Sequence, residues 1–377
     1  MHESAYLDDT HRLLAESVRR FVEKEVVPRG AAWEAQGAVP REILREMGKL
    51  GFLGLRHPEA YGGAALDAPA TAVLAEELGR STFGGFAVTV LVHTDMASPH
   101  LRHAGSQEQL HRWMPAIVTG ECITAVAVTE PDAGSDVKAI RTRATKATSG
   151  WRLDGTKMFI TNGVLADLYF VAAKTDVAAG AKGVSMFAVR KGARGLSVGR
   201  QLDKMGWRCS DTAELVFQGC EAELLGGEGQ GFYAIMRNFQ NERIALGAMA
   251  IGEASKALEL TLDYVKTRRA FGAPLWEKQA VRQRLAQLAG EIEAGRRLVH
   301  HAAWLDSRGA DCVKEVSMVK AYCGELVNRA MYECLQFHGG AGFIKETAIE
   351  RMYRDARVQS IGGGATEVML EEVAKRL

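Results

Sequence analysis

The sequence predicts an α+β fold in three parts. These are an N-terminal helical domain (residues 1–121), a central small β-barrel or β-sandwich domain (122–225) and a C-terminal four-helix bundle (226–377). Apolar residues recur at helical spacing over the first ~120 residues, and short β-rich runs replace them from about Cys122. Long helical patterns return after the glycine-rich loop at 226–231. A chain of 377 residues is also too long for one compact core, so more than one domain is expected.

The N-terminal part begins with a helix that Asp8 or Asp9 can cap and that runs to Pro28. A second helix is expected to have Pro40 in its first turn and to end at Gly51. Further helices are expected over residues 71–78 and 107–118.

The central part contains six short runs rich in β-forming residues, separated by turn residues. An Asp154-Gly155 pair between two of these runs predicts a tight β-hairpin. The predicted strands cover residues 122–128, 151–153, 158–161, 168–173, 184–189 and 214–217. In the C-terminal part, residues 232–265, 276–308 and 313–337 are each long enough to form a helix of a bundle.

Composition excludes several classes of function. With 47 basic and 46 acidic residues, the chain is not expected to bind nucleic acid or an acidic membrane. The longest apolar run, residues 83–92, is much shorter than the ~20 residues that span a bilayer. The N-terminus lacks the basic and apolar segments of a secretion signal, so a cytoplasmic location is expected. His93, His100 and His103 lack acidic or thiolate partners at ligand spacing, so no metal site is predicted.

Two segments carry the strongest functional signal. Residues 125–136 read AVAVTEPDAGSD, and residues 157–163 read KMFITNG. In the first, a buried strand runs into a loop that contains Thr129, Gly134 and Ser135, which suits a ligand with a flat ring and a phosphate tail. In the second, Phe159 and Thr161 lie two residues apart on a strand and therefore face the same way.

In this order and spacing, the two segments resemble the flavin-binding signature of the acyl-CoA dehydrogenase family. Three later segments extend the resemblance over essentially the whole chain: TRRAFGAPLWEKQ at 267–279, QFHGGAGF at 336–343, and RDARVQSIGGGATE at 354–367. The resemblance implies FAD as the cofactor. It also implies a homotetramer built as a dimer of dimers, because family members supply the first two of these segments to FAD across a subunit interface.

The resemblance assigns individual roles within the FAD site. Val128 and Thr129 are expected at the pyrimidine edge of the flavin, Ser135 at the phosphates, and Phe159 and Thr161 behind and beside the ring. The complete set of cofactor-binding residues that it implies is Val126, Val128, Thr129, Gly134, Ser135, Phe159, Ile160, Thr161, Arg268, Phe271, Gln279, Gln336, Gly339, Gly340 and Glu367. An arginine can clamp a pyrophosphate, and glycines let a backbone approach a ligand closely. Taken alone, the segments at 267–279 and 336–343 could equally be a solvated arginine pair and a helix C-cap.

The position of the catalytic base follows from the same resemblance. Removing hydrogen from Cα and Cβ of a thioester needs a base for the α proton and an acceptor for the β hydride. Protein side chains cannot accept a hydride, so a cofactor must do so. Family members keep a glutamate base in one of two places. One corresponds here to Gly363, which cannot serve, and the other to Glu242, directly before Arg243, as in the long-chain and isovaleryl-type branches.

We therefore predict that Glu242 is the base, with a pKa raised by an apolar pocket. The backbone N–H of Gly363 is expected to help hold the thioester oxygen. The alternative for Glu242 is an ordinary carboxylate on a helix face.

Ser135, Phe239, Gln240 and Arg243 are the residues predicted to bind the substrate. The apolar residues Phe232, Ile235, Met236 and Phe239 could line an acyl tunnel or belong to a core stripe. The sequence does not predict the length or branching of the acyl chain.

The function implied is that of an FAD-dependent acyl-CoA dehydrogenase of fatty acid β-oxidation. It would convert an acyl-CoA to a trans-2-enoyl-CoA and pass electrons to an electron-transferring flavoprotein. The alternatives are a dehydrogenase of a carrier-protein-bound acyl thioester, a flavin oxidase or monooxygenase of the same fold, and a non-catalytic flavin-binding scaffold.

Overall fold

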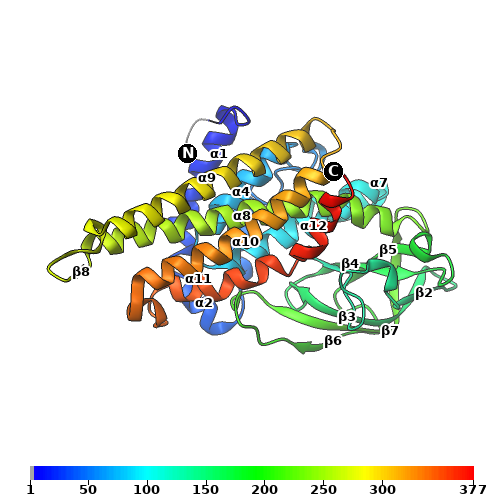
Figure 1. Cartoon of the computed structure of the whole chain (residues 1–377). Helices are drawn as coiled ribbons and strands as arrows, with labels where there is room; N and C mark the ends of the chain where they lie inside the picture. The colour runs from blue at the N-terminus through cyan, green and yellow to red at the C-terminus, as the bar shows by residue number, and fades with distance from the viewer. Residues whose placement is uncertain (1–3) are drawn as a thin grey trace.

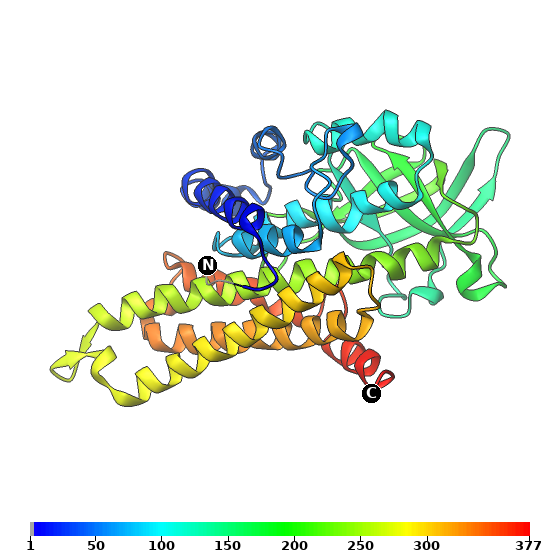
Figure 2. The same ribbon diagram turned by 90° about the horizontal axis from the view of Figure 1, so that it is seen from above.

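The computed structural model describes residues 4–377. Helices come first, a β-rich region follows, and long helices complete the chain (Figure 1). The β-rich region lies at one end of the long helices, and the small hairpin of β8 (Arg269–Ala270) and β9 (Ala273–Pro274) lies at the opposite end. Figure 2, seen from above, shows the same separation.

The N-terminal helices include two short π-helical turns, η1 and η3. The elements are α1 (Asp9–Phe21), η1 (Val22–Val26), α2 (Gly30–Gln36), α3 (Arg41–Lys49), η2 (Glu59–Tyr61), α4 (Ala68–Gly79), α5 (Gly84–Leu91), η3 (Val92–Ala97), α6 (Ser98–Ala104) and α7 (Gln107–Val118).

The N-terminal cap of α1 is Asp8, whose carboxylate accepts a hydrogen bond from the His11 N–H. The predicted place of Pro40 is wrong by one residue. Pro40 precedes α3 in an extended conformation (ψ 146°) and the helix begins at Arg41. The fixed φ of proline suits both the residue before a helix and the first helical residue, so the sequence alone does not distinguish these two positions.

The central strands close into a ring in which β4, β2, β3, β7 and β5 are hydrogen-bonded in turn and β5 returns to β4. Strand β1 pairs in parallel with β4, and β6 pairs with β7. The strands are β1 (Thr124–Ala127), β2 (Arg143–Lys146), β3 (Trp151–Thr161), β4 (Leu168–Lys174), β5 (Val184–Arg190), β6 (Leu196–Gln201) and β7 (Thr212–Leu225), with short turns η4 (Val137–Ala139) and η5 (Gly180–Gly183).

The hairpin predicted at Asp154-Gly155 is wrong. Strand β3 continues through this pair, and its register with β7 shifts between Leu153 and Gly155, which marks a bulge. A Cβ on Gly155 would lie 2.5 Å from Thr142 Oγ1. The glycine therefore serves a close backbone approach inside the barrel, and the chain turns instead at residues 147–150 between β2 and β3.

Strand β4 is buried on both faces because it separates two hydrophobic cores. Tyr169 and Val171 point into the barrel core, and Phe170 and Ala172 belong to the core shared with α7. This alternation is the period-two pattern of a strand. It fixes the barrel against the N-terminal helices.

Three long helices dominate the C-terminal part and lie alongside one another (Figure 1). Helices α11 and α12 pack against α10, and α4 from the N-terminal part packs against α8 and α9. The elements are α8 (Gly231–Thr267), β8 (Arg269–Ala270), β9 (Ala273–Pro274), η6 (Leu275–Glu277), α9 (Gln279–Ser307), α10 (Val313–His338), η7 (Gly339–Phe343), α11 (Ala348–Ala356), η8 (Arg357–Ser360) and α12 (Thr366–Ala374). Within residues 4–377, no helix combines the length and apolar character needed to cross a membrane.

Candidate active site

The structure places Glu242 and Gly363 side by side. Glu242 is partly buried on α8, and Gly363 lies in the turn between η8 and α12. A Cβ built on Gly363 would lie 3.1 Å from Glu242 Oε1 and 2.2 Å from Leu246 Cδ1. With φ at 67°, Gly363 also has a left-handed backbone that favours glycine. The turn can therefore approach the carboxylate only because this residue has no side chain.

The Glu242 carboxylate has neither a hydrogen bond nor an ion pair with any residue between 4 and 377. Burial raises its pKa to about 7, and the positive charges of Arg243 and Lys320 oppose that rise. A carboxylate with a pKa near neutral can accept a proton in one step of a reaction and release it in the next. An ordinary helix-face carboxylate would be solvated or paired instead.

The helix that carries Glu242 is fixed by two asparagines on its preceding turn. Asn238 Nδ2 donates to the carbonyls of Asp95 (3.2 Å) and Met96 (2.9 Å), and Asn241 Nδ2 donates to the Asp95 carbonyl (2.8 Å). Both acceptors lie in the π-helical turn η3, where i→i+5 bonding is rare and often marks functional sites. The sequence prediction gave no role to these asparagines, although two buried amides three residues apart on one helix were a usable signal.

The same π-helical turn reaches the barrel. His93 lies within hydrogen-bond distance of the Thr124 hydroxyl (Nδ1 to Oγ1, 3.0 Å), and Thr124 is the first residue of β1. Glu242 on α8 and the predicted flavin-binding loop after β1 are thus connected through η3.

The two predicted flavin-binding segments are joined directly. The Thr129 carbonyl accepts from the Met158 N–H (2.9 Å), and Lys157 Nζ donates to the Val128 carbonyl (2.8 Å). The same ammonium forms a buried ion pair with Glu130 Oε1 at 2.8 Å. The end of β1 and the middle of β3 are therefore held together as one surface.

Phe159 is the most unusual residue of this surface. Its backbone has φ 61°, its side chain is 65% exposed, and the register of β3 with β7 shifts between Lys157 and Ile160. A left-handed aromatic residue presented to solvent is strained, and such strain is common where a ligand binds. Ile160 beside it is buried, so its side chain is not available to a ligand.

These residues fit a flavin with its phosphates. The hydroxyls of Thr129, Ser135 and Thr161 have no hydrogen-bond partner within residues 4–377, and each lies on or beside the two joined segments. Gly134 has open space around its Cα. Val126 in β1 and Val128 directly after it are partly buried. An exposed ring with unpaired hydroxyls nearby matches a flat heterocycle that carries polar edges and a phosphate tail.

The remaining predicted FAD-binding residues lie elsewhere. Arg268, Phe271 and Gln279 lie at or beside the β8–β9 hairpin, and Gln336, Gly339 and Gly340 lie at the end of α10. All six are exposed, and Phe271 is 95% exposed. The rings of Tyr264 and His338 stack at 4.5 Å and bring the ends of α8 and α10 together.

Within one chain, this second group is far from the first. Helix α8 has 37 residues, which at about 1.5 Å per residue gives roughly 55 Å. Its first residues pack on β5 of the barrel, and its last residue precedes Arg268. The first group therefore lies near the barrel end of α8 and the second near its far end, where Figures 1 and 2 show the small hairpin that contains β8. Glu367, predicted with them, is exposed in the first turn of α12.

Three of the four residues predicted to bind substrate lie next to Glu242 on α8. The Arg243 guanidinium lies 5.7 Å from the centre of the Phe239 ring, and the side-chain oxygen Oε1 of Gln240 accepts from the Cys312 thiol. Ile235, one of the apolar residues proposed for a tunnel, is fully buried in the core between the barrel and α7. For that residue the core alternative is correct.

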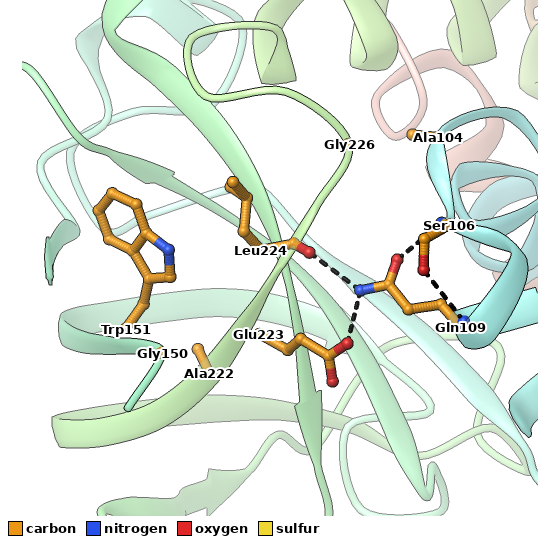
Figure 3. A pocket seen from close by; sticks show the side chains of 9 residues that line it. All are labelled: Ala104, Ser106, Gln109, Gly150, Trp151, Ala222, Glu223, Leu224 and Gly226. Atoms are coloured by element: carbon orange, nitrogen blue, oxygen red, sulfur yellow. Dashed lines mark hydrogen bonds between the residues drawn. The ribbon is translucent and has the colours of Figure 1, made fainter. Parts of the chain in front are cut away.

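A hollow of about 630 Å³ between α7 and the ends of β3 and β7 is separate from all of these residues (Figure 3). Its polar lining is internally paired, because Gln109 Nε2 donates to Glu223 Oε1 (2.7 Å) and to the Leu224 carbonyl (3.0 Å). The hollow lies between the helical region and the barrel, and none of the predicted site residues lines it.

Comparisons with known proteins identify the family. Models of the N-terminal, middle and C-terminal domains of acyl-CoA dehydrogenase match residues 8–121, 125–220 and 229–377. The mitochondrial long-chain specific acyl-CoA dehydrogenase of Mus musculus is 40% identical over 97% of this chain and 86% of its own length. The crystal structure of an acyl-CoA dehydrogenase from Geobacillus kaustophilus superposes with a TM-score of 0.95 at 39% identity, covering 99% of both chains.

A structure of PigA in complex with FAD also superposes, with a TM-score of 0.95 at 28% identity over 100% of this chain and 99% of that one. The chain belongs to the acyl-CoA dehydrogenase family of FAD-dependent oxidoreductases that act on CH–CH groups. The resemblance and the three-part fold predicted from the sequence are both confirmed.

Replacing Lys157 by Met is expected to destabilise the barrel. The substitution leaves the Glu130 carboxylate buried without its partner, which typically costs about 3–5 kcal/mol. Urea unfolding followed by tryptophan fluorescence measures the change. The double variant Lys157→Met/Glu130→Gln is expected to recover most of the loss. A double variant as unstable as the single one would contradict this account of the ion pair.

Proposed function

We propose that this protein removes one hydrogen each from Cα and Cβ of an acyl-CoA thioester and yields the trans-2-enoyl-CoA, with Glu242 as the base for the α proton. The observation that carries the proposal is the unpaired Glu242 carboxylate beside Gly363, with a pKa near 7. The side chain can therefore accept a proton at neutral pH, and it lies beside Gly363, whose N–H has no backbone partner within residues 4–377.

The chemistry divides between the cofactor and the chain. Bound FAD would supply the acceptor for the β hydrogen and its electron pair. Glu242 takes the α proton, which leaves negative charge on the thioester oxygen as the C–H bond breaks. The Gly363 N–H is proposed to donate to that oxygen, and Gly363 lacks the side chain that would push the turn away. Two hydrogens leave the substrate, and one C=C bond forms.

Substrate contacts are proposed for the residues around the base. Phe239, Gln240 and Arg243 share α8 with Glu242, and Ser135 lies on the loop that follows β1. Arg243 suits an anionic or carbonyl group of the coenzyme because its guanidinium is buried and its Nε has no hydrogen-bond partner within residues 4–377.

We propose that each FAD is held by two subunits of a homotetramer built as a dimer of dimers. Support comes from the separation of the two groups of FAD-binding residues by the length of α8 and from the exposure of the second group. Contact with a partner subunit would cover the ring of Phe271, which is 95% exposed in the single chain. The electron acceptor is proposed to be an electron-transferring flavoprotein.

Anaerobic titration of the FAD-loaded protein with a panel of acyl-CoAs tests the function. We expect flavin absorbance near ~450 nm to bleach, because the flavin takes up the electrons, with the preferred chain lengths bleaching at the lowest concentrations. If only acyl thioesters of acyl carrier protein bleach the flavin, the substrate handle is wrong. Fast reoxidation by air in the presence of bound product would favour an oxidase. No bleaching by any thioester would sink the proposal.

The pH dependence of the reaction follows from the Glu242 pKa of about 7. Only the ionised carboxylate accepts a proton, so activity is lost as pH falls through this value. We expect kcat/KM for an acyl-CoA to rise about tenfold per pH unit below the pKa and to level off above it. A profile that stays flat between pH 5.5 and about 8 would contradict the assignment of Glu242 as the base.

A further inference from the structure

A buried lysine on α10 holds the turn that carries Gly363. Lys320 is 2% exposed, and its Nζ donates to the carbonyl of Gln359 (2.5 Å) and to the carbonyl of Gly364 (3.0 Å). These two carbonyls lie on either side of Gly363 in the chain. Burial of an ammonium group is costly unless it is fully bonded, so a purely structural contact would more simply use an uncharged donor.

The backbone of α10 is shaped for the same contact. One turn beyond Lys320, a Cβ on Gly324 would lie 2.8 Å from the Gln359 carbonyl oxygen. Gln359 is also tied to α8, because its Nε2 donates to Glu253 Oε2 (3.3 Å). The segment before Gly363 is thus clamped between the helix that carries Glu242 and the helix that carries Lys320.

We infer that Lys320 is a positioning residue for the dehydrogenation, which holds the Gly363 turn against Glu242 and supplies a positive charge that favours the ionised carboxylate. The inference rests on the function proposed above. It adds a third element, α10, to a site otherwise built from α8 and the turn before α12.

The charges around the site are compatible with this role. Lys320 faces Glu242 and Arg243 on α8 and Cys323 and Glu325 on its own helix, and Arg243 in turn faces Glu372 and Arg376. Burial raises the pKa of the Cys323 thiol to about 12, so it stays neutral. Burial lowers the pKa of Lys320 to about 8, so the ammonium is charged over the range in which Glu242 titrates.

Three replacements separate charge from hydrogen bonding. Lys320→Met removes both, Lys320→Gln keeps a donor without charge, and Lys320→Arg keeps both. Lys204→Met is the control, since Lys204 is another partly buried lysine, bonded to the Thr212 hydroxyl (2.9 Å) and far along the chain from this turn. Each FAD-loaded variant is reduced anaerobically by the best acyl-CoA of wild type over a range of pH.

For Lys320→Met we expect the rate of flavin reduction to fall about 100-fold, with little change in the acyl-CoA concentration at half-saturation. We expect the midpoint of the pH profile to move upward for the Met and Gln variants and to stay in place for the Arg and control variants. If the Met variant fails to fold, the Gln variant carries the test through its midpoint.

Two results distinguish the possible failures. If wild type is not reduced by any acyl-CoA, the proposed function itself fails. If wild type is reduced but a folded Gln or Met variant keeps both its rate and its pH midpoint, the role of Lys320 is overturned and the lysine serves packing alone.

Discussion

Glu242→Gln is expected to lower the rate of flavin reduction by an acyl-CoA roughly 1,000-fold, within the range that a positioned general base contributes. Glutamine keeps the size of the side chain but has no basic oxygen at neutral pH. Because the wild-type carboxylate makes no hydrogen bond or ion pair with residues 4–377, the variant should fold and retain FAD. Stopped-flow absorbance under anaerobic conditions measures the rate.

Glu259→Gln is the matched control for this substitution. Glu259 lies on the same helix but pairs with Arg80 (2.6 Å) and Lys256 (2.5 Å) at the surface. Surface pairs of this kind contribute little, so its rate should stay within about twofold of wild type. If the two variants reduce the flavin at equal rates, Glu242 is not the base.

Gly363→Ala is expected to reduce the rate about 100-fold, the scale at which a misplacement of about 1 Å acts. The added methyl group would lie 2.2 Å from Leu246 Cδ1 and 3.1 Å from Glu242 Oε1. The alanine would also have to adopt φ 67°, a left-handed conformation that costs an L-residue about 1–2 kcal/mol. Relief of both strains moves the turn away from the carboxylate.

Gly362→Ala provides the comparison. A Cβ there meets its nearest atoms, both of Val358, at 3.7 and 3.8 Å, which is ordinary van der Waals contact. The backbone of Gly362 does not have a positive φ. We expect its loss of rate to be at least about ten times smaller than that of Gly363→Ala. Similar losses would mean that the turn does not contribute through its closeness to Glu242.

Much of the fold could be predicted from local pattern. The long C-terminal helices begin and end within a few residues of their predicted limits, because each carries an extended periodic apolar face. The strands that were missed, β2 and β6, are short or largely exposed and carry little apolar alternation. The hairpin prediction at Asp154-Gly155 was wrong because the glycine is needed for the close approach of Thr142. Thr142 lies elsewhere in the chain, so the local sequence pattern does not reveal this contact.

Family motifs name candidate site residues from the sequence alone, whereas the residues that support them through packing could not be named from the sequence. Glu242 was proposed as the base because Gly363 occupies the alternative position for it, and the structure places the two residues side by side. The support from Asn238, Asn241 and Lys320 depends on which helices meet α8, and that is a property of the assembled fold.

The most direct test of the central claim is exchange of the α hydrogen with solvent. FAD-loaded protein is incubated anaerobically in D₂O with its preferred acyl-CoA until the reaction reaches equilibrium, and deuterium in the recovered acyl-CoA is located by NMR. With Glu242 as the base, wild type should place deuterium at Cα and Glu242→Gln should place almost none. Equal incorporation by both proteins, or none by a wild type whose flavin bleaches, would contradict the account.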